Sequence, residues 1–136
     1  GPGAGAMSSD GAKGRLLTKA AGFLEQKEPE TALRKAQKAL TIAKEAMDVR
    51  GEIEALCLLA EGRMAMRQSA KAANAALEAA GQSGKLKDRQ VAATALTTIA
   101  DILVRLQRPE DALLVAEQAR VAFGECGDVV GQGALF

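Results

Sequence analysis

The chain has 136 residues, of which 48% are hydrophobic, and its 18 basic and 17 acidic residues give a formal net charge of +1. This length suits one folded domain, and the apolar content is too high for a disordered chain. The charge balance provides no basic footprint for nucleic acid, and the absence of histidine removes the commonest general base and metal ligand.

Membrane insertion and catalysis are also disfavoured. No apolar run approaches the ~20 residues that a membrane-spanning helix needs. The two cysteines, Cys57 and Cys126, lie far apart and lack metal-ligand spacing, which favours a reducing, cytoplasmic setting over a disulfide framework or a zinc site. We therefore expect no enzyme activity, no metal and no cofactor.

Residues 1–12 are predicted to form a flexible tail, and Gly1–Ala6 looks like a protease-site remnant with a vector linker. From residue 13 onward, apolar residues recur at helical spacing and strand signals are absent, which predicts an all-α domain over 13–136. The predicted helices cover 13–26, 29–47, 49–67, 70–80, 88–107 and 109–124, with a further helix that starts at 128 and runs out at 136.

Several local signals mark where these helices start and stop. Pro29 and Pro109 suit the first position of a helix, because proline has a preset φ and needs no N–H partner there. Carboxylates that accept free N–H groups of a first turn are predicted at Asp48, Asp88 and Asp128, and Ser69 is the predicted cap of the fourth helix. The segment 81–84, Gly-Gln-Ser-Gly, is predicted to be a loop.

The chain repeats itself with a period of 40 residues. Pro109-Glu-Asp-Ala-Leu echoes Pro29-Glu-Thr-Ala-Leu, and the predicted aspartate caps follow the same period. Such a period is typical of a repeat array. It predicts repeats over about 13–47, 48–87 and 88–127 with a partial fourth at 128–136, so we expect a chain cut from a longer array or one that meets its next helix in another molecule.

Small residues recur in this period at three positions of each helix pair, where two helices approach closely. They are Ala20, Ala60 and Ala100, then Ala32, Ala72 and Ala112, then Ala39, Ala79 and Ala119. With Leu16, Leu56 and Leu96 at the first large position, this pattern resembles the tetratricopeptide repeat family. The longer repeat resembles the extended type found in kinesin light chains and spindle-orientation adaptors. The aromatic residue that usually follows the first small one is present only as Phe23.

The resemblance implies a right-handed superhelical array of antiparallel helix pairs whose first helices line a concave groove for a peptide or helical segment of a partner protein. The groove residues implied in this way are Leu17, Ala21, Leu24, Glu25, Glu54, Cys57, Glu61, Met64, Ala65, Thr94, Thr97, Asp101, Val104 and Arg105. Four carboxylates against one arginine on this face favour a basic or amphipathic ligand over an acidic tail.

Other readings stay open. The carboxylates can be solvated surface residues without a partner, and Cys57 is expected to be a packing residue rather than a nucleophile, since no base lies near it in the sequence. Asp101 can pair with Arg105 one turn on. An alternative function is self-association into a homodimer through the C-terminal end, at Leu135 and Phe136. A nucleic-acid-binding helical repeat is a weaker alternative, because the charge balance opposes it.

Overall fold

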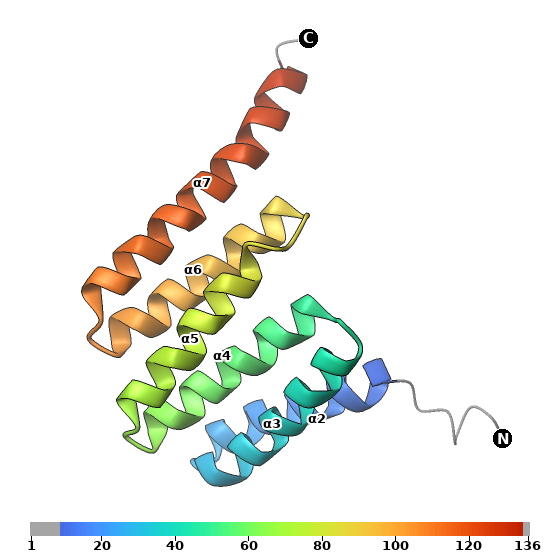
Figure 1. Cartoon of the computed structure of the whole chain (residues 1–136), viewed down its shortest axis with the longest axis vertical. Coiled ribbons are helices and arrows are strands. Elements are labelled where there is room, and N and C mark those ends of the chain that lie inside the picture. Colours follow the sequence, from blue (N-terminus) through green and yellow to red (C-terminus); the bar gives the residue numbers. More distant parts are fainter. Residues whose placement is uncertain (1–8, 135–136) are drawn as a thin grey trace, which may run out of the picture.

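The computed structural model describes residues 9–134 of the chain and the side chains of residues 10–126. Within these residues the protein is all-α, and neighbouring helices pack as antiparallel pairs (Figure 1). The predicted all-α array of helix pairs is therefore confirmed. The helices are α2 (Ser9–Glu25), α3 (Pro29–Glu45), α4 (Val49–Ala65), α5 (Ser69–Ser83), α6 (Arg89–Arg105) and α7 (Pro109–Ala134).

Three helix pairs stack to form the array. The pairs are α2 with α3, α4 with α5, and α6 with α7, and each of α3 and α5 also packs on the first helix of the following pair. The first helices touch one another as well, α2 with α4 and α4 with α6. They therefore form one continuous side of the array, on which a groove can develop.

Alanine dominates the contacts between helices. Because its side chain is a single carbon, two helix backbones can approach closely where it lies, and larger residues such as Leu56, Leu96 and Leu103 fill the remaining space. The small-residue positions predicted from the period are confirmed as buried positions. None exposes more than 9% of its surface: Ala20, Ala32, Ala39, Ala60, Ala72, Ala79, Ala100, Ala112 and Ala119.

Four of the five connections are three-residue turns of one kind. In each, the middle residue has a positive φ of 55–61°, and these residues are Lys27, Met47, Arg67 and Gln107. At Met47, for example, the N–H donates to the carbonyl of Lys44 at 3.1 Å, and the next N–H, of Asp48, donates to the carbonyl of Ala43 at 2.8 Å. These two backbone hydrogen bonds provide donors for carbonyls at the end of the helix. The turns therefore recur every 20 residues, at half the period of the sequence repeat.

The start signals at Asp48, Asp88, Pro29 and Pro109 are confirmed, whereas Asp128 lies inside a helix. Asp48 Oδ1 accepts the backbone N–H of Gly51 at 3.0 Å, and Asp88 caps α6 in the same way. Pro29 and Pro109 are the first residues of α3 and α7. The starts of α3, α4, α6 and α7 therefore use either a side-chain acceptor or a residue without an N–H at the free donors of the first turn.

Two predictions about α5 are wrong. Ser69 is the first residue of the helix rather than its cap, because Gln68 lies at the cap position and makes no side-chain capping bond. The predicted loop at 81–84 is mostly helical, since α5 continues to Ser83. Ser83 is fully buried and its hydroxyl donates to the Ala79 carbonyl at 2.8 Å, so burial outweighs the weak helix propensity of Gly81.

The outer ends of the array also differ from the prediction. Helix α2 begins at Ser9, inside the predicted tail, where Asp10 in its first turn suits the helix dipole and forms an ion pair with Lys13. Helix α7 runs unbroken to Ala134, so the predicted stop near Gly124 and the new helix at Asp128 are wrong. Extending a helix adds one hydrogen bond per residue, whereas a new helix needs an unfavourable nucleus.

The connection between α5 and α6 departs from the common turn. It has five residues, 84–88, and Lys87, which is in register with the other left-handed positions, has no positive φ. Instead the N–H of Lys85 donates to the Gln82 carbonyl at 3.0 Å, and that of Leu86 to the Ser83 carbonyl at 3.2 Å. This longer connection places the half-buried side chain of Leu86 beside the first helices.

Replacing Met47 by glycine should raise the free energy of unfolding by up to about 1 kcal/mol. A left-handed conformation costs a residue with a Cβ about 1–2 kcal/mol, and the greater freedom of glycine in the unfolded chain offsets about 0.5–1 kcal/mol of that gain. Met47 is 85% exposed, so the substitution removes little packing. Chemical denaturation measures the change.

Lys38→Gly, which is exposed in the middle of α3, is the matched control and should instead lower the free energy of unfolding by about 0.5–1 kcal/mol. Equal losses in the two variants would contradict the left-handed turn at Met47.

Candidate functional site

A cavity of about 510 Å³ lies between α4 and α6, on the side of the array formed by the first helices. We call it the α4–α6 cavity. Its polar side chains are Arg50, Glu54, Glu61, Gln90, Thr94 and Thr98. Its apolar lining consists of Leu17 from α2, Ile53, Cys57 and Leu58 from α4, Leu86 from the long connection, and Val91 and Ala95 from α6.

The cavity brings together five of the residues implied by the family resemblance: Leu17, Glu54, Cys57, Glu61 and Thr94. The others lie outside its lining. Among them, Val104 and Glu25 are exposed, Met64 packs half-buried against the core, and the Thr97 hydroxyl donates to the Ala93 carbonyl at 2.9 Å. The remaining residues outside the lining are Ala21, Leu24, Ala65, Asp101 and Arg105. The second predicted surface, Leu135 and Phe136, lies outside the described residues.

Sequence reasoning missed the end of the cavity formed by the α5–α6 connection. Leu86, Gln90 and Val91 line it, although the equivalent positions of the preceding repeat lie at or just after a tight turn. A 40-residue period assigns the same environment to equivalent residues of each repeat, so it cannot predict that one connection is longer than the others. The glycines at 81 and 84, from which a loop is predicted, were the available sequence signal that this connection differs from the others.

The carboxylates of this face are largely paired with arginines. Arg105 Nη2 lies 3.0 Å from Glu61 Oε1, and its Nε lies 3.2 Å from Asp101 Oδ2, which confirms the predicted pair one turn apart. Glu54 lies 3.8 Å from the Nε of Arg50. The sequence alone indicated a clear excess of negative charge, but Arg50 was missing from that assignment. With Arg50 included, four carboxylates lie against two arginines, so the preference of the face for a basic ligand is smaller than the sequence indicated. Exposed ion pairs of this kind contribute little stability.

Cys57 is the only cysteine in the cavity lining. Burial, reinforced by the negative charges of Glu61 and Glu54, raises the pKa of its thiol to about 12. The thiolate is the reactive form of cysteine, so at neutral pH this side chain is a small apolar contact surface. The expectation of a packing residue rather than a nucleophile fits this environment.

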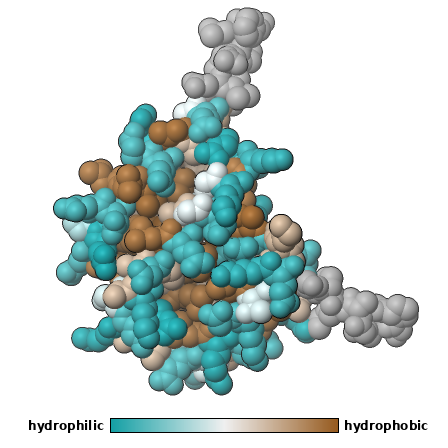
Figure 2. Space-filling view, viewed as in Figure 1, coloured by the Kyte–Doolittle hydropathy of each residue, from teal (hydrophilic) through white to brown (hydrophobic). Residues whose placement is uncertain are grey.

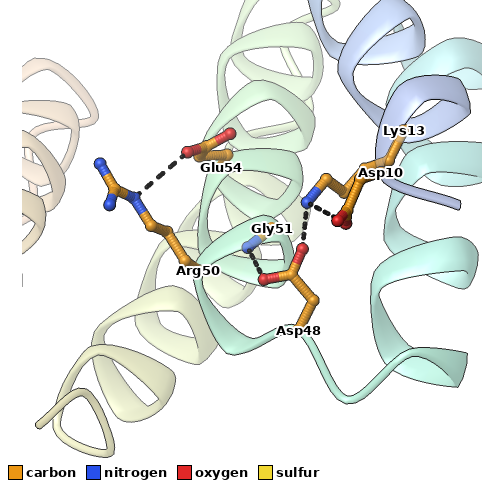
Figure 3. Close-up of polar contacts among 6 residues, drawn as sticks. All are labelled: Asp10, Lys13, Asp48, Arg50, Gly51 and Glu54. Carbon is orange, nitrogen blue, oxygen red and sulfur yellow. Dashed lines mark hydrogen bonds and ion pairs between the residues drawn. The ribbon is translucent and has the colours of Figure 1, made fainter. Parts of the chain in front are cut away.

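An ion pair fixes α2 against the start of α4 at one side of the cavity (Figure 3). The Lys13 ammonium contacts the carboxylate of Asp48 and lies 3.6 Å from Asp10, while the other oxygen of Asp48 caps α4 at Gly51. Arg50 and Glu54, in the first two turns of α4, line the cavity. We call the contact of Lys13, Asp48 and Gly51 the α2–α4 latch.

The latch shifts the pKa of both charged partners. The hydrogen bond from Lys13, with that from the Gly51 N–H, lowers the pKa of Asp48, and the bond to Asp48 raises the pKa of Lys13. A lowered carboxyl pKa stabilises the fold above the usual pKa of an aspartate, and this contribution is lost as pH falls through the lowered value. The raised pKa of Lys13 stabilises the fold below the usual lysine pKa of about 10. At neutral pH both groups are charged, so the latch is intact.

Among the described residues, no group of three or more His, Cys, Asp and Glu side chains could hold a metal ion. None of the described helices is both long and apolar enough to cross a lipid bilayer.

Comparison with known proteins identifies the fold. No protein-family model matches the chain, and no curated protein sequence matches it. The structure is similar to the crystal structure of the TPR domain of Arabidopsis FLU, with a TM-score of 0.67 and 19% sequence identity over 87% of this chain and 99% of that chain. The chain therefore has the tetratricopeptide-repeat fold, built here from repeats of 40 residues.

Gly51→Ala should lower the free energy of unfolding by about 1–3 kcal/mol, the usual cost of overpacking. A Cβ at this position would overlap the Asp48 carboxylate and lie 2.8 Å from Lys13 Cδ, so the latch and the cap cannot both persist. Thermal or chemical denaturation checks this.

Gly14→Ala is the matched control for the latch, because a Cβ there has no neighbour within 4 Å. It should raise stability by about 0.5–1 kcal/mol through helix propensity. If both alanines stabilise the protein, the latch does not form as described.

The Cys57 thiol should react with iodoacetamide far more slowly in the folded protein than in denaturant. With a pKa of about 12, the thiolate fraction at pH 8 is about one in ten thousand. Mass spectrometry of the Cys126→Ser variant isolates this thiol, and its rate should rise about tenfold for each pH unit while the protein stays folded. A rate equal to that in denaturant would show that Cys57 is neither buried nor perturbed.

Proposed function

We propose that the chain is a protein–protein interaction module that binds an amphipathic segment of a partner protein in the α4–α6 cavity. The observation that carries this proposal is the apolar lining of the cavity on the side formed by the first helices. Its volume of about 510 Å³ lies within the range of pockets that bind ligands, and a few convergent polar groups surround it. This combination suits one or two apolar side chains of a partner segment, with its polar face toward solvent.

The polar rim supports a more specific ligand. Glu54 is the least constrained carboxylate of the lining, since its contact with Arg50 is long and its side chain is 53% exposed. Glu61 is held by Arg105 at 3.0 Å and has less freedom to change partner. A lysine or arginine that follows the apolar anchor of the partner segment would pair with Glu54, so the proposed ligand is amphipathic with a basic flank.

Blocking the cavity tests this proposal. Peptides selected from a random display library on the wild-type protein should share an apolar anchor, and Ala95→Trp, which fills the cavity, should weaken their binding by about tenfold or more in calorimetry. Ala70→Trp, at an exposed position of α5 outside the cavity lining, is the control and should leave binding unchanged.

Glu54→Lys separates the charge proposal from the cavity proposal. It should weaken the selected peptides that carry a basic flank and spare those that do not. Failure to enrich any peptide, or peptides that bind Ala95→Trp as well as the wild type, would overturn the proposed site.

A further inference from the structure

The outer side of α7 corresponds to a surface that is covered in the rest of the array. Helix α7 packs principally on α6, through Ala112, Val115, Ala119 and Ala122. In α3 and α5, the adjoining stripe of residues is also covered, because the next first helix packs there. Leu33 of α3, for instance, would lie 2.7 Å from a Cβ at Gly62 of α4.

The same stripe can be followed through the three second helices at a spacing of three, four and three residues. In α5 its four members are buried: Ala73, Ala76, Ala80 and Ser83. In α7 the equivalent residues are all exposed, and we call them the α7 outer face: Leu113, Ala116, Arg120 and Phe123. Leu113 exposes 73% of its surface and Phe123 exposes 43%. Apolar side chains gather at the surface over the first half of α7 (Figure 2).

The α7 outer face does not fit another helix docked in the manner of the inner repeats. Phe123 takes the place of Ala43 and Ser83, which are both fully buried where the next helix passes. A phenylalanine there would overpack the closest approach. Arg120 takes the place of Leu40 and Ala80, so the same docking would bury a guanidinium in an apolar contact, which is unfavourable.

The face is instead complementary to itself when its direction is reversed. In an antiparallel pair about a two-fold axis, Leu113 meets Phe123 of a second copy, so that the two large residues lie together at each end. Arg120 meets the small Ala116 of the second copy, which leaves room for its side chain. Glu117, beside this stripe, lies within 2.6 Å of Arg120 in the same helix, so across the axis each Arg120 also has a carboxylate within reach.

We propose that two copies of the chain associate through the α7 outer face, with the two α7 helices antiparallel. The self-complementary charges select a second copy as the partner, and Arg120 and Phe123 disfavour a further repeat at this face. The α4–α6 cavity is lined by α2, α4, α6 and the α5–α6 connection, with no residue of α7. Both cavities therefore stay open in the dimer, and this proposal does not depend on the proposed ligand.

Sedimentation velocity over a wide concentration range tests the dimer. The wild-type protein should associate reversibly, and Leu113→Glu should raise the dimer Kd by about tenfold or more. Leu114→Glu is the matched control, because Leu114 is the next residue, is 60% exposed, and lies off the proposed stripe. A wild-type monomer at all concentrations, or equal effects of the two glutamates, would overturn the proposal.

A charge exchange tests the antiparallel arrangement itself. Glu117→Arg and Arg120→Glu each place like charges across the axis, so each variant alone should be mainly monomeric. Mixed together they should form a heterodimer, because the arginines at positions 117 and 120 of one chain then face the glutamates at these positions of the other. The pair within each helix stays broken in this mixture, so association can arise only from contacts between chains. A mixture that remains monomeric while the wild type dimerises would exclude this arrangement.

Discussion

Close approach of helices through alanine is the constraint on which this structure depends. Each buried alanine removes little apolar surface from water, so the array is held together by many short contacts rather than by a few large side chains. Such contacts require the helices to keep their relative positions, and the identical three-residue turns at Lys27, Met47, Arg67 and Gln107 provide this. Non-glycine residues accept a left-handed conformation there because packing of the flanking helices outweighs the local cost.

The candidate site arises where this regularity is interrupted. The five-residue connection before α6 replaces a tight turn, and α6 lies beside α4 with the α4–α6 cavity between them. On the other side of α4, the latch of Lys13 and Asp48 fixes α2 in place. One wall of the cavity is therefore rigidly attached to the first pair, and the other is set by the longer connection. A fold of otherwise uniform repeats gains a distinct surface in this way.

The two surfaces proposed to bind partners occupy different positions in the helix pairs. The cavity lies between two first helices, whereas the α7 outer face is exposed although the equivalent residues of α3 and α5 contact the next helix. In α7 the side chains at these positions differ. Arg120 and Phe123 occupy the positions at which Leu40 and Ala43 are buried in α3. The corresponding stripe of α7 is therefore exposed and carries a charged and an aromatic side chain.

The sequence by itself determined the all-α class, the 40-residue repeat, the buried alanines and the caps at Asp48 and Asp88, because these follow from residue spacing within single helices and turns. It misplaced the ends of α5 and α7 and missed Arg50, Leu86 and Val91 in the cavity. Those features depend on tertiary contacts: Ser83 is helical because its environment buries it, and Leu86 lines the cavity because one connection differs in length. Periodicity assigns the same environment to equivalent residues, and only packing shows where that equivalence fails.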